Sequence, residues 1–97
     1  MQLVKRIEII IDSPELPALV AVLQQEKVPG YTVFHNLSGA GDRGERRNDE
    51  PGGGGGNACV LIAATPVRTP AIVEAIRPIL KRRGGICLVS DAQSVIH

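Results

Sequence analysis

The sequence contains almost no aromatic residues. Tyr31 and Phe34 are its only aromatic side chains, and there is no Trp. Proteins that bind single-stranded nucleic acids stack bases on aromatic rings and carry a strongly basic surface, whereas the formal net charge here is only +1. We therefore expect no nucleic-acid partner. The core has to be built from aliphatic side chains.

Long apolar runs are also missing. No run approaches the roughly 18 residues that a membrane-spanning helix needs. The first residues, MQLVKRIEIII, lack the basic region, apolar segment and cleavage site of a signal peptide. We expect a soluble, cytoplasmic protein. Its length predicts a single domain, residues 1–97, which would bury only about 60–65% of the surface of the unfolded chain, so that self-assembly would help to stabilise it.

Cysteine and histidine are too few and too scattered to predict a metal site. Cys59 and Cys87 each lie within an apolar run, where most cysteines are small core residues. His35 and His97 do not form a metal-ligand spacing with either cysteine. We expect neither a metal site nor a catalytic Cys/His arrangement.

Glycine, in contrast, is abundant. The segment GAGDRG, residues 39–44, has the glycine spacing of the dinucleotide-binding fingerprint, which requires a helix directly after the loop. The residues that follow include Pro51 and five successive glycines, 52–56, which strongly disfavour a helix. The segment is interpreted instead as a glycine-rich loop whose backbone N–H groups and arginines can hold an anion.

The hydrophobic pattern predicts four strands and two helices. The predicted strands cover residues 3–11, 31–37, 58–64 and 86–89, and apolar helical stripes follow Ser13-Pro14 and Thr65-Pro66 or Thr69-Pro70. With right-handed crossovers, the order strand, helix, strand, long loop, strand, helix, strand gives an α+β fold, the ferredoxin-like βαββαβ sandwich. This fold has a four-stranded antiparallel sheet with both helices on one face.

Several local signals refine this prediction. Ser13 is predicted to cap the first helix, and Pro78 is predicted to bend or shorten the second helix, because proline cannot donate to the carbonyl four residues earlier. The first strand should lie between the third and the fourth, which places Cys59 and Cys87 about 9–10 Å apart and excludes a disulfide. The face of the sheet opposite the helices carries Val, Ile and Leu, so we expect neighbouring subunits to bury it.

The loop over residues 38–57 admits two interpretations. It contains eight glycines and no apolar periodicity, and compact domains rarely keep so long a structureless loop unless it has a function or is disordered. Its arginines share the loop with acidic residues, which is typical of a solvated, self-paired tip. The same arginines could instead contact a ligand or a partner.

The order and spacing of the whole chain resemble the PII signal-transduction superfamily. The motifs that carry the resemblance are GYTV, residues 30–33, at the second strand, GAG, residues 39–41, at its end, and the long loop before the third strand. The resemblance implies a homotrimer whose sheets pack into a barrel-like core. It also implies adenine-nucleotide sites in the clefts between subunits and a flexible T-loop, residues 38–57, that contacts a partner.

The resemblance also implies which residues bind the nucleotide. Thr32 matches the threonine near the adenine, and Gly39 and Gly41 match the glycines at the base of the T-loop. Gly84 and Gly85 fall where the glycine-containing B-loop of the family wraps the phosphates.

Departures from the family pattern change the expected ligands. The loop has no tyrosine to be uridylylated, RRGG replaces the lysine-containing B-loop, and the last residues contain no RxR. Loss of these cations favours ADP or AMP over ATP, since each charge-assisted hydrogen bond contributes about 1.5–3 kcal/mol. Arg43 is then expected to contact the nucleotide, and Arg46 and Arg47 are expected to bind an anion, bicarbonate or phosphate.

The short arginine- and glycine-rich loop resembles most the PII-like proteins associated with carboxysomes and bicarbonate transporters. That subgroup implies a non-catalytic sensor of adenine nucleotide that responds to bicarbonate and acts on a bicarbonate transporter or another membrane protein. Two alternatives are a metal-sensing or metal-tolerance trimer of similar fold and a small phosphohydrolase on a ferredoxin-like scaffold. The hydrolase would need a glycine- and arginine-containing phosphate loop after the first strand, and IDSPELP, residues 11–17, supplies neither residue type.

Overall fold

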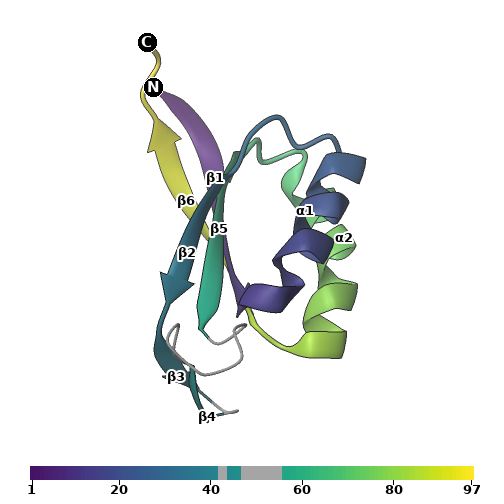
Figure 1. Ribbon diagram of the computed structural model, residues 1–97. Helices are drawn as coiled ribbons and strands as arrows, with labels where there is room; N and C mark the ends of the chain where they lie inside the picture. The colour runs from purple at the N-terminus through teal and green to yellow at the C-terminus, as the bar shows by residue number, and fades with distance from the viewer. Residues whose placement is uncertain (42–43, 47–55) are drawn as a thin grey trace.

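The computed structural model describes residues 1–41, 44–46 and 56–97. Its elements are β1 (Gln2–Asp12), the short 3-10 helix η1 (Ser13–Glu15), α1 (Leu16–Gln25), β2 (Thr32–Leu37), β3 (Gly39–Gly41), β4 (Gly44–Arg46), β5 (Asn57–Ala64), α2 (Thr69–Arg83) and β6 (Ile86–Ser94). Four strands form an antiparallel sheet in the order β2-β5-β1-β6, and α1 and α2 lie side by side on one of its faces (Figure 1). The predicted fold class is confirmed.

The core lies between the sheet and the two helices, and the buried apolar side chains of the described residues are aliphatic. Alternation along β1 turns Ile7, Ile9 and Ile11 toward the helices, and all three are buried. β5 alternates in the same way, as the period-2 geometry of a strand requires. The remaining buried apolar residues are Ala58, Val60, Ile62 and Ala64 of β5, Leu19 and Leu23 of α1, and Ile72, Ile76 and Ile79 of α2.

The pairing of β1 with β6 is longer than the sequence pattern predicts. It extends from Ile10 opposite Ile86 to Gln2 opposite Ser94, whereas the predicted last strand ends at Val89. β5 pairs with β1 only from Lys5 onward, so the first residues of β1 project beyond it with β6. Leu3 lies in this projecting part and is accordingly 67% exposed.

The helix-start signals differ in their outcome. Ser13 does not cap a helix with its side chain; it begins η1, and α1 starts three residues later, at Leu16. Of the two later signals, Thr69-Pro70 marks the start of α2, which has no side-chain cap. The Thr65 Oγ1 accepts a hydrogen bond from the Arg68 N–H at 3.3 Å in the turn before the helix. Pro78 does not shorten α2, which continues to Arg83.

The segment between β2 and β5 is not without structure. β3 and β4 pair antiparallel, Gly39 opposite Arg46 and Gly41 opposite Gly44, which corrects the prediction of a structureless loop over residues 38–57. The rest of this prediction falls on residues 42–43 and 47–55, outside the described part of the chain.

The two cysteines lie on opposite faces of the sheet. Both are free, and they flank β1, with Cys59 opposite Ile10 and Cys87 opposite Ile9. Successive residues of a strand point to opposite faces. Cys87 therefore packs against the core below the helices, whereas Cys59 lies on the other face, which corrects the prediction that both are core residues.

None of the helices in the described residues is long and apolar enough to cross a membrane.

Candidate functional site

The predicted glycines lie at one end of the sheet, which we call the loop end. Here β2 leads into β3, β5 begins and β6 begins (Figure 1). Asn57 marks this end, since it is opposite Leu37 of β2 and opposite Asp12 of β1. The Ser13 N–H donates to the Gly56 carbonyl at 3.3 Å, which holds the start of β5 against the end of β1.

Gly84 and Gly85 form the turn from α2 into β6. Gly84 has φ 80°, and its N–H donates to the Leu80 carbonyl at 2.8 Å. Gly85 has φ 114°, and a Cβ atom there would lie 2.7 Å from the backbone oxygen of Ile10. Only glycine fits this turn, so the local fold accounts for Gly85 without any ligand.

Gly39 begins the other part of the loop end. It is exposed, and among the described residues a Cβ atom there would meet the Asn57 side-chain nitrogen, at 3.9 Å. Gly41 is described through its backbone pairing with Gly44. Because β2 and β6 are the two edges of the sheet, the glycines of β3 and those of the α2–β6 turn are separated by three strand spacings, roughly 14 Å.

Thr32 lies away from the loop end. It is the first residue of β2, exposed and opposite Leu61 of β5, about 16 Å along the strand from Leu37. One copy of the chain thus brings the four glycines to one end of the sheet but does not gather them and Thr32 into one pocket-sized site. A ligand that used all of them would need surfaces from more than one copy.

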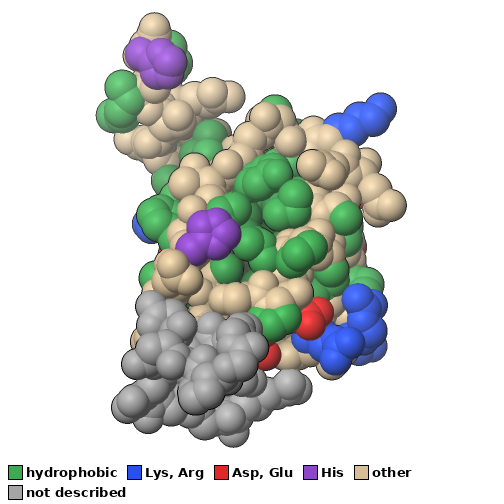
Figure 2. Space-filling model, viewed as in Figure 1, with side chains coloured by type: hydrophobic (Ala, Val, Ile, Leu, Met, Phe, Trp, Pro, Cys, Tyr) green, Lys and Arg blue, Asp and Glu red, His purple; other side chains and the backbone are tan. Residues whose placement is uncertain are grey.

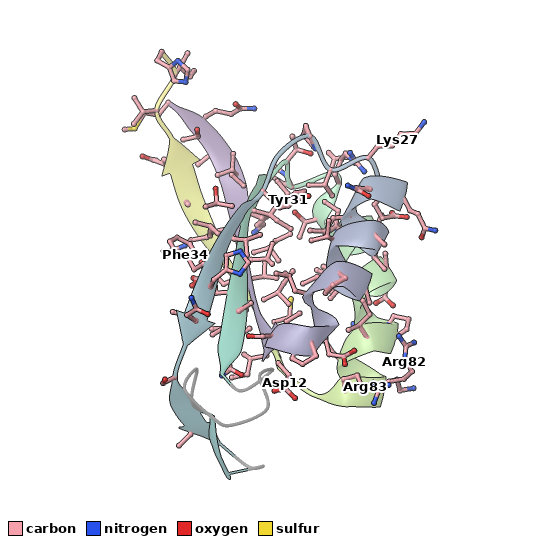
Figure 3. All side chains as sticks on the ribbon, viewed as in Figure 1. Asp12, Lys27, Tyr31, Phe34, Arg82 and Arg83 are labelled. Carbon is pink, nitrogen blue, oxygen red and sulfur yellow. The ribbon has the colours of Figure 1, made fainter. Side chains whose placement is uncertain are left out.

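Three cations lie beside the glycine turn. Lys81, Arg82 and Arg83 form the last turn of α2 and are exposed. Figure 3 shows Arg82 and Arg83 at the end of this helix, with Asp12 at the nearby end of β1. The Arg83 Nε lies 3.5 Å from a carboxylate oxygen of Glu15, so part of the cluster ties α2 to η1, and its charge also complements the helix dipole.

Figure 2 shows a group of Lys and Arg side chains on the surface at this end of the molecule. The arginines predicted to contact ligands lie in the segment over residues 38–57. Arg43 and Arg47 lie outside the described residues, and Arg46 is described only through its backbone pairing with Gly39. Their roles stay predictions.

The sequence interpretation assigned no role to a charged pair on the face of the sheet opposite the helices, which we call the uncovered face. The Arg6 Nε and a Glu8 carboxylate oxygen lie 3.2 Å apart on β1. Burial, together with the negative charge of Glu8, raises the pKa of the nearby Cys59 thiol, and Arg6 opposes this shift. The signal was available: period-2 alternation places Arg6 and Glu8 on the face that carries Ile10.

A second missed feature is the irregularity that ends β2. The register shifts between Phe34 and Leu37, and Asn36 has φ 60°, a left-handed conformation that asparagine adopts more readily than most residues. This bulge lies directly before β3, at the base of the predicted ligand-responsive loop.

Comparison with known proteins identifies the family. The sequence pattern of the family described as nitrogen regulatory protein P-II matches residues 4–96. The chain belongs to the P-II family. Its members are regulatory signal-transduction proteins, and the predicted superfamily is confirmed. No curated protein matches the sequence.

Solved structures confirm the P-II fold over the length of the chain. The structure of CPII, a nitrogen regulatory PII-like protein from Thiomonas intermedia K12, bound to ADP, AMP and bicarbonate, is 24% identical, with a TM-score of 0.85 over 95% of this chain and 88% of CPII. The apo form of CPII is 22% identical, with a TM-score of 0.76 over 95% of this chain and 91% of that one. A putative PII-like signaling protein from Thermus thermophilus is 19% identical, with a TM-score of 0.75 over 95% and 91% of the two chains.

Within the described ranges, no group of three or more His, Cys, Asp and Glu residues could hold a metal ion. The P-II fold here therefore presents glycines, exposed cations and an uncovered sheet face as its candidate functional features.

Proposed function

We propose that this P-II protein is a non-catalytic cytoplasmic sensor that binds ADP or AMP between subunits of a homotrimer and responds to bicarbonate. The observation that carries the proposal is the match to CPII along nearly the whole chain, because CPII is bound to these ligands in its structures. The position of the predicted glycines supports it. Gly39 and Gly41 lie at the same end of the sheet as Gly84 and Gly85, with Arg82 beside them.

The separation of these residues favours a site shared between copies. Thr32 and the two glycine pairs are spread along and across the sheet, and the face opposite the helices is apolar and open. A trimer, as is typical of P-II proteins, would cover this face and bring loop ends of different copies together.

We assign the anion response to the arginines of the segment over residues 38–57. Bicarbonate is a planar oxyanion that a guanidinium fork holds through two parallel hydrogen bonds. Arg46 and Arg47 would supply that fork, and Arg43 would reach the nucleotide. Ordering the segment costs roughly 1–2 kcal/mol of conformational entropy for each residue fixed. The ligand that binds first would meet part of this cost, so the second ligand would bind to a segment that is already ordered. Nucleotide and bicarbonate would therefore bind cooperatively.

The ordered segment would then carry the signal to a partner. We place that partner in inorganic-carbon uptake, as a bicarbonate transporter or another membrane protein. The proposal rests on the resemblance to carboxysome-associated PII-like proteins.

Calorimetric titration of ADP, AMP and ATP, with and without millimolar bicarbonate, tests the proposal. Bicarbonate should increase the affinity of the protein for ADP or AMP. The nucleotide should increase the affinity for bicarbonate by the same factor, as linkage requires. Nucleotide binding that ignores bicarbonate would remove the carbon-uptake assignment. Absence of nucleotide binding would overturn the sensor proposal, and metal titration would then test the alternative trimer.

Variants of the loop arginines locate the anion site. Arg46→Ala and Arg47→Ala should each weaken the bicarbonate response by roughly tenfold or more, as expected for the loss of a charge-assisted hydrogen bond. Arg77→Ala provides the matched control, since Arg77 is exposed on α2 and forms a local ion pair with Glu74 at 3.0 Å. Unchanged affinities in both loop variants would show that these arginines do not hold the anion.

A further inference from the structure

The strand β2 contains one residue more than the stretch of β5 with which it pairs. Phe34 is opposite Cys59, and Leu37 is opposite Asn57. Between these two pairs β2 has two residues, whereas β5 has one. This arrangement is a β-bulge, which bends a strand and increases its twist.

The extra residue changes the face of the sheet on which the end of β2 lies. Val33 packs against the core below the helices, and strict alternation would place Leu37 on the same face, because successive residues of a strand point to opposite faces. Leu37 is instead opposite Asn57, which precedes Cys59 of the uncovered face by two residues on β5. The bulge therefore moves Leu37, which is 37% exposed, to the uncovered face.

The same change of face determines the position of β3. Gly39 follows Leu37 by two residues, and a Cβ atom at Gly39 would lie 3.9 Å from the side-chain nitrogen of Asn57. Gly39 pairs with Arg46 of β4, and Figure 1 shows β3 and β4 extending past the end of the sheet. The pairing of β2 with β5 ends at Leu37. The direction in which β2 leaves the bulge therefore sets where β3 and β4 lie.

Asn36 holds the bulge in a backbone conformation that few residues adopt readily. Its φ is 60°, in the left-handed region, which glycine and asparagine tolerate best and β-branched residues tolerate least. Lys27 has nearly the same value, φ 56°, but it follows α1 at the other end of the molecule (Figure 3). The two residues share a conformation, and Asn36 is the one that lies at the base of β3.

We propose that Asn36 is a positioning residue for the ligand site, because its left-handed conformation fixes the bulge that directs β3 and β4. The glycines of β3 and Arg46 of β4 are thereby held where nucleotide and anion reach them. The property required at position 36 is the backbone conformation, and the amide side chain is dispensable. This inference rests on the proposed function and adds the residue that sets the geometry of its site.

Substitutions at position 36 separate the backbone conformation from the side chain. Asn36→Gly keeps the left-handed conformation and removes the amide, so ADP should bind within about threefold of the wild type in calorimetric titration. Asn36→Val disfavours the conformation, so ADP binding should weaken by about tenfold. This factor corresponds to about 1.4 kcal/mol and lies within the cost of a left-handed conformation for a residue with a Cβ atom.

Lys27→Val is the matched control, because it introduces the same side chain at nearly the same φ but away from β3 and β4. Both valine variants should lose a similar amount of stability in urea unfolding, because both strain the backbone. Asn36→Val should lose ADP affinity, whereas Lys27→Val should keep it. A loss of affinity caused by lower stability alone would affect both variants and would overturn the proposal.

NMR spectroscopy measures the bulge directly and requires no ligand. Nuclear Overhauser contacts between Leu37 and Asn57 and between Gly39 and Arg46 should be present in the wild type and in Asn36→Gly, and they should weaken in Asn36→Val. Equal ADP affinities of Asn36→Val and the wild type would overturn the proposal. Equal losses of affinity in the glycine and valine variants would also overturn it, since they would indicate a side-chain contact.

Titration of the wild type distinguishes this inference from the proposed function. If the wild type bound no ADP, the sensor function would be overturned, and the NMR contacts alone would decide whether Asn36 directs β3 and β4. If the wild type bound ADP and the NMR contacts were unchanged in Asn36→Val, nucleotide binding would stand and the role of Asn36 would be overturned.

Discussion

Gly85 occupies a backbone conformation that side chains disfavour, at a place where no side chain fits. Its φ is 114°, and a Cβ atom would lie 2.7 Å from the Ile10 carbonyl oxygen and 3.0 Å from Ile11. The turn joins α2 to β6, and its geometry depends on close approach to β1. Adding a Cβ atom at position 85 would therefore disturb the turn that connects α2 to β6.

Gly85→Ala should reduce the free energy of unfolding by about 2–4 kcal/mol, through backbone strain and the clash with β1. Urea unfolding followed by circular dichroism measures the loss. Gly30→Ala is the control, because no atom of the described part of the chain lies within 4 Å of a Cβ atom there, and it should change stability by less than about 1 kcal/mol. Equal effects of the two substitutions would contradict the strain argument.

Arg68 joins the two helices through backbone carbonyls. Its guanidinium donates to the Lys27 carbonyl at 3.2 Å and also to the Glu26 carbonyl, which lie just beyond the C-terminus of α1, where helix carbonyls lack partners. Arg68→Ala should lower the free energy of unfolding by about 1–3 kcal/mol. Arg68→Lys should lower it by a smaller amount, because lysine keeps the positive charge but lacks the planar fork of the guanidinium group.

Thermal unfolding of the Arg68 variants measures this effect. Arg77→Ala serves as the reference for loss of an exposed arginine, and little change is expected there. If Arg68→Ala unfolded at the wild-type temperature, these hydrogen bonds would not contribute to joining α1 and α2.

The helix α2 contains an interior proline that costs stability without ending the helix. Proline at position 78 cannot donate to the carbonyl of Glu74, yet α2 extends a further five residues to Arg83. The helix persists because Ile72, Ile76 and Ile79 pack it against the sheet, and tertiary packing outweighs local propensity. The sequence prediction weighed Pro78 by propensity alone.

Pro78→Ala should increase the free energy of unfolding by about 1–3 kcal/mol by restoring a backbone donor. Pro70→Ala is the control, because Pro70 lies in the first turn of α2, where a missing N–H costs little. Hydrogen exchange of the α2 amides together with urea unfolding would detect the difference. If Pro78→Ala did not increase the free energy of unfolding, the fold would already compensate for the missing backbone hydrogen bond.

Strand and helix positions could be predicted because apolar periodicity sets them. Ile7, Ile9 and Ile11 fix which face of β1 is buried, and no other arrangement of that strand hides them all. The end of β6 could not be predicted in this way, since Ser90 and Asp91 are poor strand formers. Pairing with the long β1 keeps them in the sheet, and the Lys5–Asp91 ion pair accompanies that pairing.

The candidate site was predicted through the family resemblance rather than through periodicity. Gly84 and Gly85 could be located from the sequence, but their positive φ angles and the contact with Ile10 belong to the turn as folded. Arg6 and Glu8 were visible as one face of a strand. Their place beside Leu61 and Leu88 depends on strands far apart in the sequence.

The thiols of the two cysteines link the stability of the molecule to alkaline pH. Burial raises the pKa of Cys87 as well as that of Cys59, so in the folded state both thiols bind their protons more tightly than in the unfolded state. Their contribution to stability is therefore fully present below the ordinary thiol pKa. It is lost as the pH rises through the folded-state values.

Stability should accordingly fall more steeply above about pH 8.5 in the wild type than in the Cys59→Ser/Cys87→Ser variant. Urea unfolding at several pH values between about 7 and 10 compares the two proteins, and the double variant accounts for the titration of tyrosine and lysine. Parallel stability curves would show that the thiols do not contribute.

The sequence by itself determined the strands and helices, the aliphatic core and the superfamily, because period-2 and period-3.6 patterns and short motifs are local properties of the chain. Only the tertiary structure decided the length of β6, the pairing of β3 with β4 and the separation of Thr32 from the glycines. It also decided the placement of Cys59 on the uncovered face. The physical reason is that these features depend on contacts between residues distant in the chain, which no local pattern encodes.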